Sequence, residues 1–178
     1  KIKKINLIFE ELDIVQLNQL SKIIKPSNFK SLINNKIKEG ILVSEIEIFL
    51  TEQGVFKDFI AKGSVKDSKV ELFNGLNFSR ANFSFFADKS YVLIKNIFGD
   101  LEDVKISDGD IKLNFEDGIK LTSNFNSKIN LDELLLNKYS KFLNKNRFIN
   151  YIKSLKADLS NNFSIELDNT YKVKNFEY

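Results

Sequence analysis

The sequence predicts a mostly β protein with short helices, of the α+β class, built on an elongated, curved antiparallel sheet. Apolar and polar residues alternate from about residue 41 to residue 127. Turn signals separate these runs at intervals of about 8–12 residues, as in a meander of antiparallel strands. Helical spacing of apolar residues occurs twice, each time just before strands. With 178 residues, 43% of them hydrophobic, the chain is large enough to fold around a core.

The N-terminal region predicts a strand followed by a pair of helices. Apolar residues alternate over 2–9, and from 12 to 24 they recur at helical spacing. We expect this helix to end at Pro26, because a residue before proline is pushed out of the α region. A second short helix, NFKSLINNKIK, is expected to end at Gly40.

The central region predicts a series of short hairpins. Its strand-like runs are SEIEIFL, SKVELF, NFSFF, YVLIKNIF, EDVKI, DIKLNF and GIKLTSNF. Turn signals lie between them at Asn74-Gly75, Gly99-Asp100, Asp108-Gly109 and Asp117-Gly118. Asn-Gly and Asp-Gly supply the positive φ angles that tight hairpins need. After this region, LDELLLNKYSKFLNKNRFINYIKSL is expected to be helical, and the remaining residues return to strands.

The order of helices and strands indicates an internal repeat. A shift of 119 residues places LDIVQLNQLSKII (12–24) over LDELLLNKYSKFL (131–143) without a gap. The sequence therefore predicts a first unit over 1–130 and the start of a second, truncated unit over 131–178, each beginning with a helical pair. Because the chain contains no Met, we expect it to be a fragment of a longer protein or a processed chain.

Composition excludes several classes of function. Without Cys or His, the chain has no thiol nucleophile, disulfide, zinc-thiolate site or Ser-His-Asp triad. The 27 basic and 24 acidic residues are evenly mixed, and only Arg80 and Arg147 are arginines. A nucleic-acid binder usually carries a clustered basic stripe, so nucleic acid is not an expected partner. We expect no catalysis, no metal and no cofactor.

Two groups of acidic residues are candidate sites. Asp100, Glu102, Asp103, Asp108 and Asp110 lie close in sequence but do not match a calcium-loop pattern, so a solvated hairpin edge is the preferred interpretation. Glu45 and Glu47 alternate along a strand, which is typical of the outer face of a sheet rather than of a glycosidase pair.

The bulky apolar residues of the strands allow two interpretations, an ordinary core or a channel for acyl chains. A site for lipid tails needs continuous apolar surface and leaves no polar motif. In the channel interpretation, part of the following phenylalanines would line it: Phe73, Phe78, Phe83, Phe85, Phe86, Phe98, Phe115 and Phe125.

The chain resembles the AsmA-like family of bacterial envelope proteins, closest to its YhdP branch. The similarity covers roughly residues 7–135. It rests on the lead-in LDxxxLNxxSK before strand GILVSEIEIFL, on Asn74-Gly75-Leu76, and on a pattern of five spaced residues. Those five residues are Phe59, Ala61, Gly63, Val65 and Asp67.

The resemblance implies a long, taco-shaped sheet with an apolar interior that moves phospholipids between the inner and outer membranes, in outer membrane biogenesis. It implies a periplasmic location, an inner-membrane anchor outside this chain, and membrane components as partners at the ends of the full-length protein. Phospholipid acyl chains are the expected ligand. The candidate groove-lining residues are Ile46, Ile48, Val70, Leu72, Phe83, Phe85, Ile111, Leu113, Phe115, Ile165 and Leu167.

Two other functions stay open on the sequence. One is a non-catalytic structural or adhesin-like repeat with a closed β-sandwich core. The other is a small lipid shuttle with a closed cavity. In addition, the segment around Tyr139–Ile152 has aromatic residues and lysines that could form a basic amphipathic helix on anionic lipid, although packing on the end of the sheet is preferred.

Overall fold

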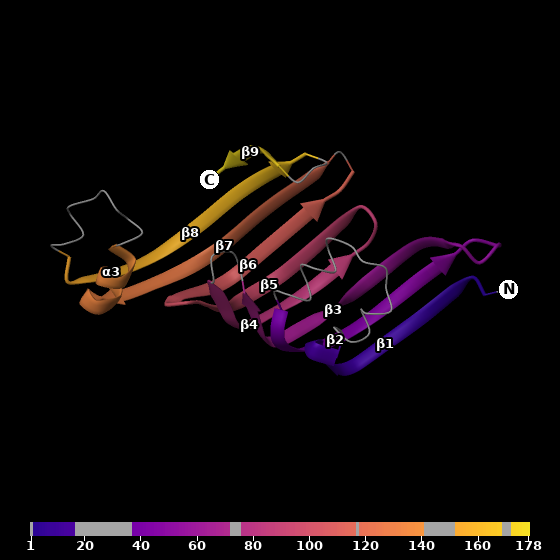
Figure 1. Cartoon of the computed structure of the whole chain (residues 1–178), viewed down its shortest axis with the longest axis horizontal. Helices are drawn as coiled ribbons and strands as arrows, with labels where there is room; N and C mark the ends of the chain where they lie inside the picture. The colour runs from indigo at the N-terminus through magenta and orange to yellow at the C-terminus, as the bar shows by residue number, and fades with distance from the viewer. Residues whose placement is uncertain (1, 17–36, 72–75, 117, 141–151, 169–171) are drawn as a thin grey trace.

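The described residues form one antiparallel sheet of nine strands, arranged in the order in which they occur along the chain (Figure 1). The computed structural model describes residues 2–16, 37–71, 76–116, 118–140, 152–168 and 172–178. The strands are β1 (Lys4–Asp13), β2 (Ile37–Leu50), β3 (Phe56–Glu71), β4 (Asn77–Ala87), β5 (Tyr91–Leu101), β6 (Val104–Asn114), β7 (Ile119–Asp132), β8 (Ser154–Leu167) and β9 (Val173–Glu177).

The predicted mostly β class is confirmed, with β2–β7 covering the alternating region. Helix α3 (Glu133–Ser140) begins where the second helical segment was expected, and residues 14–16 are helical directly after β1. Most of the rest of the two predicted helical pairs, 17–36 and 141–151, lies outside the described residues. The second helical prediction is wrong at its end, because Ser154 and Leu155 belong to β8. The prediction that the second helix runs to Gly40 is wrong at its end, because β2 begins at Ile37, which pairs with Val70 of β3.

Two of the predicted hairpin turns are also wrong. Gly99-Asp100 lies inside β5 and Asp108-Gly109 inside β6, so EDVKI and DIKLNF form one strand. The chain turns instead at Glu102, where φ is 51°. Gly118, with φ of 102°, lies in the predicted β6–β7 turn. Asn74-Gly75 is outside the described residues.

The positive φ angles inside the strands mark β-bulges. Asp67, Arg80, Asn96 and Asp108 have φ between 48° and 55°, and each lies at a register shift, in β3, β4, β5 and β6 respectively. A bulge inserts one unpaired residue, bends its strand and increases the local twist. Asn and Asp tolerate this backbone region better than most residues.

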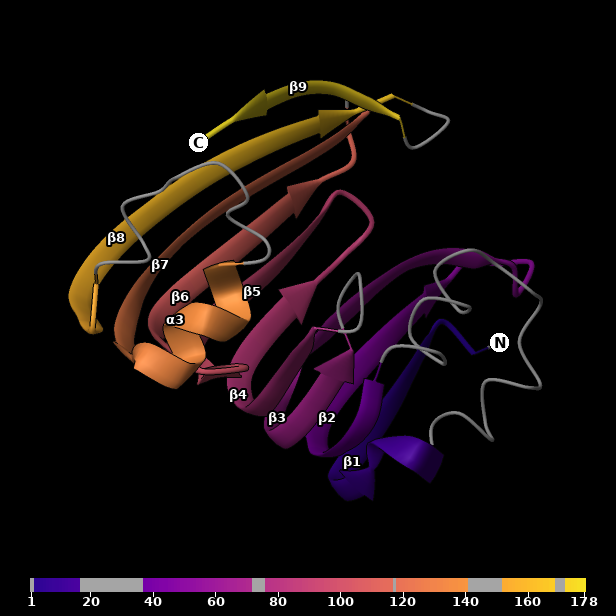
Figure 2. The same ribbon diagram turned by 60° about the vertical axis from the view of Figure 1, so that its left-hand side comes forward.

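The residue after each bulge points to the inside of the bend. Ser68, Ala81 and Ile97 are 1%, 0% and 8% exposed, and Gly109 is buried as well. Because neighbouring strands bend at matching levels, the whole sheet curves, as Figure 2 shows. Three of these four residues are small, which lets the backbones approach at the inside of the bend.

Short helical segments pack inside this curve. Ile14, after β1, is buried with Leu42 and Val65, and Leu12 and Phe83 pack against them. Helix α3 contacts β7 and β8 and lies inside their arc (Figure 2), with Leu136 5% exposed. All strands in the described part of the chain belong to this one sheet, so those residues contain no second sheet to close a sandwich.

The two predicted repeat units share an order of elements. Asp13 and Asp132 each end a strand, and their carboxylates accept hydrogen bonds of 2.9 and 3.0 Å from the backbone N–H groups of Val15 and Leu135. Strands β2 and β8, which follow, are both 14 residues long. The predicted boundary between 130 and 131 falls within β7, which pairs with both β6 and β8. The unit boundaries therefore stay a prediction from sequence.

A candidate apolar binding face

Strand register sorts the side chains of the sheet onto two faces of opposite character. Directly paired residues point to the same side of a sheet, and successive residues point to opposite sides. Following the pairs from β1 to β9 shows that most of the apolar residues lie on one side, which we call the apolar face. Its larger members are Ile5, Leu7, Phe9, Leu12, Ile37, Leu42, Ile46, Ile48, Phe59, Val65, Val70, Phe78, Phe83, Phe85, Val92, Ile94, Ile97, Leu101, Val104, Ile106, Ile111, Leu113, Ile119, Leu121, Phe125, Ile129, Leu131, Leu155, Leu159, Phe163, Ile165, Leu167 and Phe176.

No acidic or basic residue occurs on the apolar face among the paired strand residues that the structure describes. The polar side chains there are small or hydrogen-bonded. Asn161 donates to the Ser127 hydroxyl at 3.0 Å and accepts from the Tyr178 hydroxyl at 2.8 Å. Ser123 donates to the carbonyl oxygen of Asp110 at 3.0 Å. The paired residues of the described strands therefore form an uncharged surface on this side of the sheet.

Much of this apolar surface is accessible. Phe83, Phe85, Ile111 and Leu113 are only partly buried. Leu159, near the start of β8, is 42% exposed. A soluble monomer rarely exposes a contiguous apolar patch of more than a few hundred Å², and larger patches mark binding surfaces.

The opposite, outer face carries the charges, arranged as cross-strand ion pairs. Lys62 and Glu45 approach to 2.8 Å, and Lys120 and Glu166 to 2.9 Å. The hydrogen bond and charge of each lysine lower the pKa of its glutamate, and the glutamates raise the pKa values of Lys62 and Lys120 in return. These pairs are solvent-exposed, so each contributes little to the stability of the fold.

Nine of the eleven predicted lining residues lie on the apolar face. They are Ile46, Ile48, Val70, Phe83, Phe85, Ile111, Leu113, Ile165 and Leu167. Leu72 is outside the described residues. Phe115 follows the end of β6, is 41% exposed, and its backbone N–H donates to the Ser90 carbonyl oxygen at 2.8 Å.

Only part of the candidate phenylalanines lies on the apolar face. Phe86 and Phe98 point to the outer side, where Phe86 pairs with Leu93 and stacks on Tyr91 at 5.5 Å between ring centroids. Phe98 changes sides because the bulge at Asn96 reverses the alternation of β5. The predicted lining set lacks Ile94 and Leu121, which also lie on the apolar face. Both belong to alternating runs in the sequence, but only the strand register shows which face they are on.

The acidic residues of the candidate calcium loop have other partners. Asp100 forms an ion pair with Arg80 at 2.7 Å, and the Asp110 carboxylate accepts from the backbone N–H of Asn96 at 3.3 Å. Glu102 accepts from the backbone N–H of Asn77 at 2.8 Å. In the described part of the chain, no three acidic residues are grouped so that they could hold a metal ion. These carboxylates instead support the bulges and a turn.

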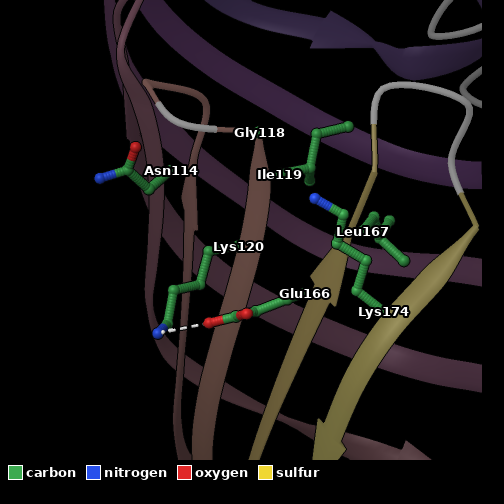
Figure 3. A pocket seen from close by; sticks show the side chains of 7 residues that line it. All are labelled: Asn114, Gly118, Ile119, Lys120, Glu166, Leu167 and Lys174. Atoms are coloured by element: carbon green, nitrogen blue, oxygen red, sulfur yellow. Dashed lines mark hydrogen bonds and ion pairs between the residues drawn. The ribbon is translucent and has the colours of Figure 1, made fainter.

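A small pocket lies where the β6–β7 and β8–β9 connections meet the sheet (Figure 3). It is lined by Asn114, Gly118, Ile119, Lys120, Glu166, Leu167 and Lys174. Ile119 and Leu167 belong to the apolar face, whereas Lys120 and Glu166 belong to the outer face. The pocket is therefore at the rim between the two faces.

Comparison with known proteins assigns no relative. The chain matches no family model, no curated protein and no solved structure. Within the described residues, no helix has both the length and the hydrophobicity to cross a membrane.

Proposed function

We propose that the apolar face is an open groove for lipid acyl chains, and that this chain is a segment of a periplasmic bridge that conducts phospholipids between the inner and outer membranes. The supporting observation is the continuous apolar face over nine strands, with no charged residue at its described paired positions. The resemblance of the sequence to AsmA-like proteins, with their repeated taco-shaped sheet, points to the same role.

The physical mechanism is passive sliding along an apolar surface. Contact between acyl chains and the apolar face removes both from water, and this attraction is non-directional. A lipid can therefore move along the groove without breaking a specific interaction at each step. The charged headgroup stays at the rim in water, because burying an unpaired charge is costly. No catalytic residue is needed for this process.

The competing structural or adhesin-like function requires a closed β-sandwich core. In such a core a second layer would cover Phe83, Phe85 and Leu113, whereas these side chains are partly exposed. The single curved sheet of the described residues therefore favours the groove over the scaffold.

A matched pair of variants tests the proposal. Leu113 of the apolar face and Leu93 of the outer face lie in neighbouring strands and are both partly buried. The purified wild-type chain, Leu113→Asp and Leu93→Asp would be analysed by native mass spectrometry, followed by solvent extraction and lipid analysis. We expect wild type and Leu93→Asp to carry phospholipid, and Leu113→Asp to lose it while remaining folded by circular dichroism.

Two outcomes would count against the groove. A lipid-free wild-type chain that is compact and stable would favour a self-contained core. Equal lipid content in Leu113→Asp and Leu93→Asp would show that lipid does not bind on the apolar face.

A further inference from the structure

The rim pocket combines a positive charge with access to the apolar face. Lys120 and Lys174 line it together with one acidic residue, Glu166 (Figure 3). Lys120 is 2.9 Å from the Glu166 carboxylate, so these two charges largely neutralise each other. Lys174 is the second positive charge beside Glu166, and its charge helps to lower the pKa of that carboxyl group. The three charged side chains that line the pocket therefore sum to a net charge of about +1 at neutral pH.

The apolar part of the pocket is continuous with the face below it. Ile119 and Leu167 are paired across β7 and β8 and both line the pocket. The next pair on the same face is Leu121 and Ile165. A molecule held by Lys174 can thus extend a hydrocarbon chain directly onto the apolar face.

We propose that this pocket binds the phosphate group of a phospholipid whose acyl chain lies on the apolar face. The inference rests on the proposed function and adds a fixed position for the headgroup. A lysine ammonium binds phosphate as a point charge with three donors. Glu166 lies beside the same space, and its negative charge weakens phosphate binding, so the net preference depends on Lys174.

Substitutions with opposite expected effects test this assignment. The probes are a short-chain dihexanoyl phosphatidic acid, the uncharged dihexanoyl glycerol and water-soluble glycerol phosphate. Lys174→Gln should weaken binding of the phosphatidic acid by about two- to five-fold, the range for one solvent-exposed ion pair. Glu166→Gln should strengthen it by a similar factor, because it removes the repulsion and releases Lys120. Affinity for dihexanoyl glycerol should not change in either variant.

Lys128→Gln is the matched control. Lys128 lies on the outer face of the same strand as Lys120, 67% exposed and 4.0 Å from Asp158, but outside the pocket. Lys128→Gln removes one positive charge, as Lys174→Gln does. We expect the Lys128→Gln variant to bind all three probes with wild-type affinity.

The outcomes separate this inference from the proposed function. Suppose that the wild-type chain binds both lipids, and that Lys174→Gln does not weaken binding of the phosphatidic acid more than Lys128→Gln does. The proposed phosphate site is then wrong, whereas the proposed acyl-chain groove is still supported. If glycerol phosphate binds as tightly as the phosphatidic acid, the pocket holds a soluble phosphate and the lipid assignment is wrong. If wild type binds neither lipid, the proposed function itself fails, and the phosphate site with it.

Discussion

The hydroxyl group of Ser68 donates a hydrogen bond of 3.1 Å to the carbonyl oxygen of Ala81. The two residues pair between β3 and β4, and each follows a residue with positive φ, Asp67 and Arg80 respectively. The bond therefore connects two neighbouring bulges at the inside of the bend. Because both side chains are almost fully buried, little space exists there for larger residues.

Gly40 is expected to be needed for the close approach of β2 to β3. Its φ is 141°, and a Cβ atom added to it would lie 2.8 Å from the Cβ of Ser68. Gly54, with φ of 83°, has no neighbouring atom within 4 Å of such a Cβ. Gly54→Ala should cost only backbone strain, about 1–2 kcal/mol. Gly40→Ala should cost more, because overpacking adds about 1–3 kcal/mol. Urea denaturation of both variants measures the difference; equal losses would contradict a steric role for Gly40.

The bulge in β5 is expected to reject β-branched side chains. Asn96 has φ of 55°, where a valine is strained. Asn96→Val should lower the free energy of unfolding by about 1–2 kcal/mol. Asn96→Gly should lower it by less, because glycine adopts positive φ readily. Asn126→Val, at an ordinary exposed position of β7, should change it by less than about 0.5 kcal/mol. Thermal unfolding of the three variants tests this, and similar results for both valine variants would argue against a bulge.

An acidic substitution on the apolar face should destabilise the fold less at a partly exposed position than at a buried one. Leu113 is partly exposed, so the carboxylate of Leu113→Asp can remain in water and unfolding should stay cooperative. Ile97 is 8% exposed at the inside of the bend, and Ile97→Asp leaves an unpaired buried charge. We expect that variant to lose several kcal/mol, about 3–5, or to be unfolded. Chemical denaturation monitored by circular dichroism compares them; equal, severe losses would indicate that Leu113 is part of a closed core.

The Lys62–Glu45 pair gives a titration prediction. The hydrogen bond from Lys62 and its charge lower the pKa of Glu45 below 4.5, and Glu45 raises the pKa of Lys62 above 10.5. A lowered carboxyl pKa stabilises the fold above pH 4.5, and this contribution is lost as pH falls through the folded-state value. A raised lysine pKa contributes below pH 10.5 and is lost as pH rises further.

The pair should therefore contribute fully only between these two pH values, and modestly, since both groups are exposed. In Lys62→Gln, the pKa of Glu45 should rise toward its ordinary value, measured by carbon NMR of the side-chain carboxyl group. An unchanged pKa in this variant would show that the two side chains do not pair in solution.

The sequence by itself determined the mostly β class and the positions of most strands, because alternation of apolar and polar residues is a local property of the chain. It also placed Ile46, Ile111 and Leu113 on a common apolar surface, since no bulge separates those positions from their cross-strand partners. The start of α3 after Asp132 followed from helical spacing in the same way.

Only the tertiary structure decided whether a positive φ angle turns the chain or bends it. Asp108-Gly109 has the composition of a hairpin turn, yet it is a bulge in β6. Gly109 pairs with Ile97 of β5, and the pairing with β7 resumes on both sides of the bulge, at Ser107 and Asp110. Each bulge reverses the alternation beyond it, which moved Phe98 to the outer face. The rim pocket depends on the same long-range pairing, which brings Lys120 of β7 beside Glu166 of β8. Local propensity determines where a strand forms, but the hydrogen-bonded neighbour determines its register and hence its face.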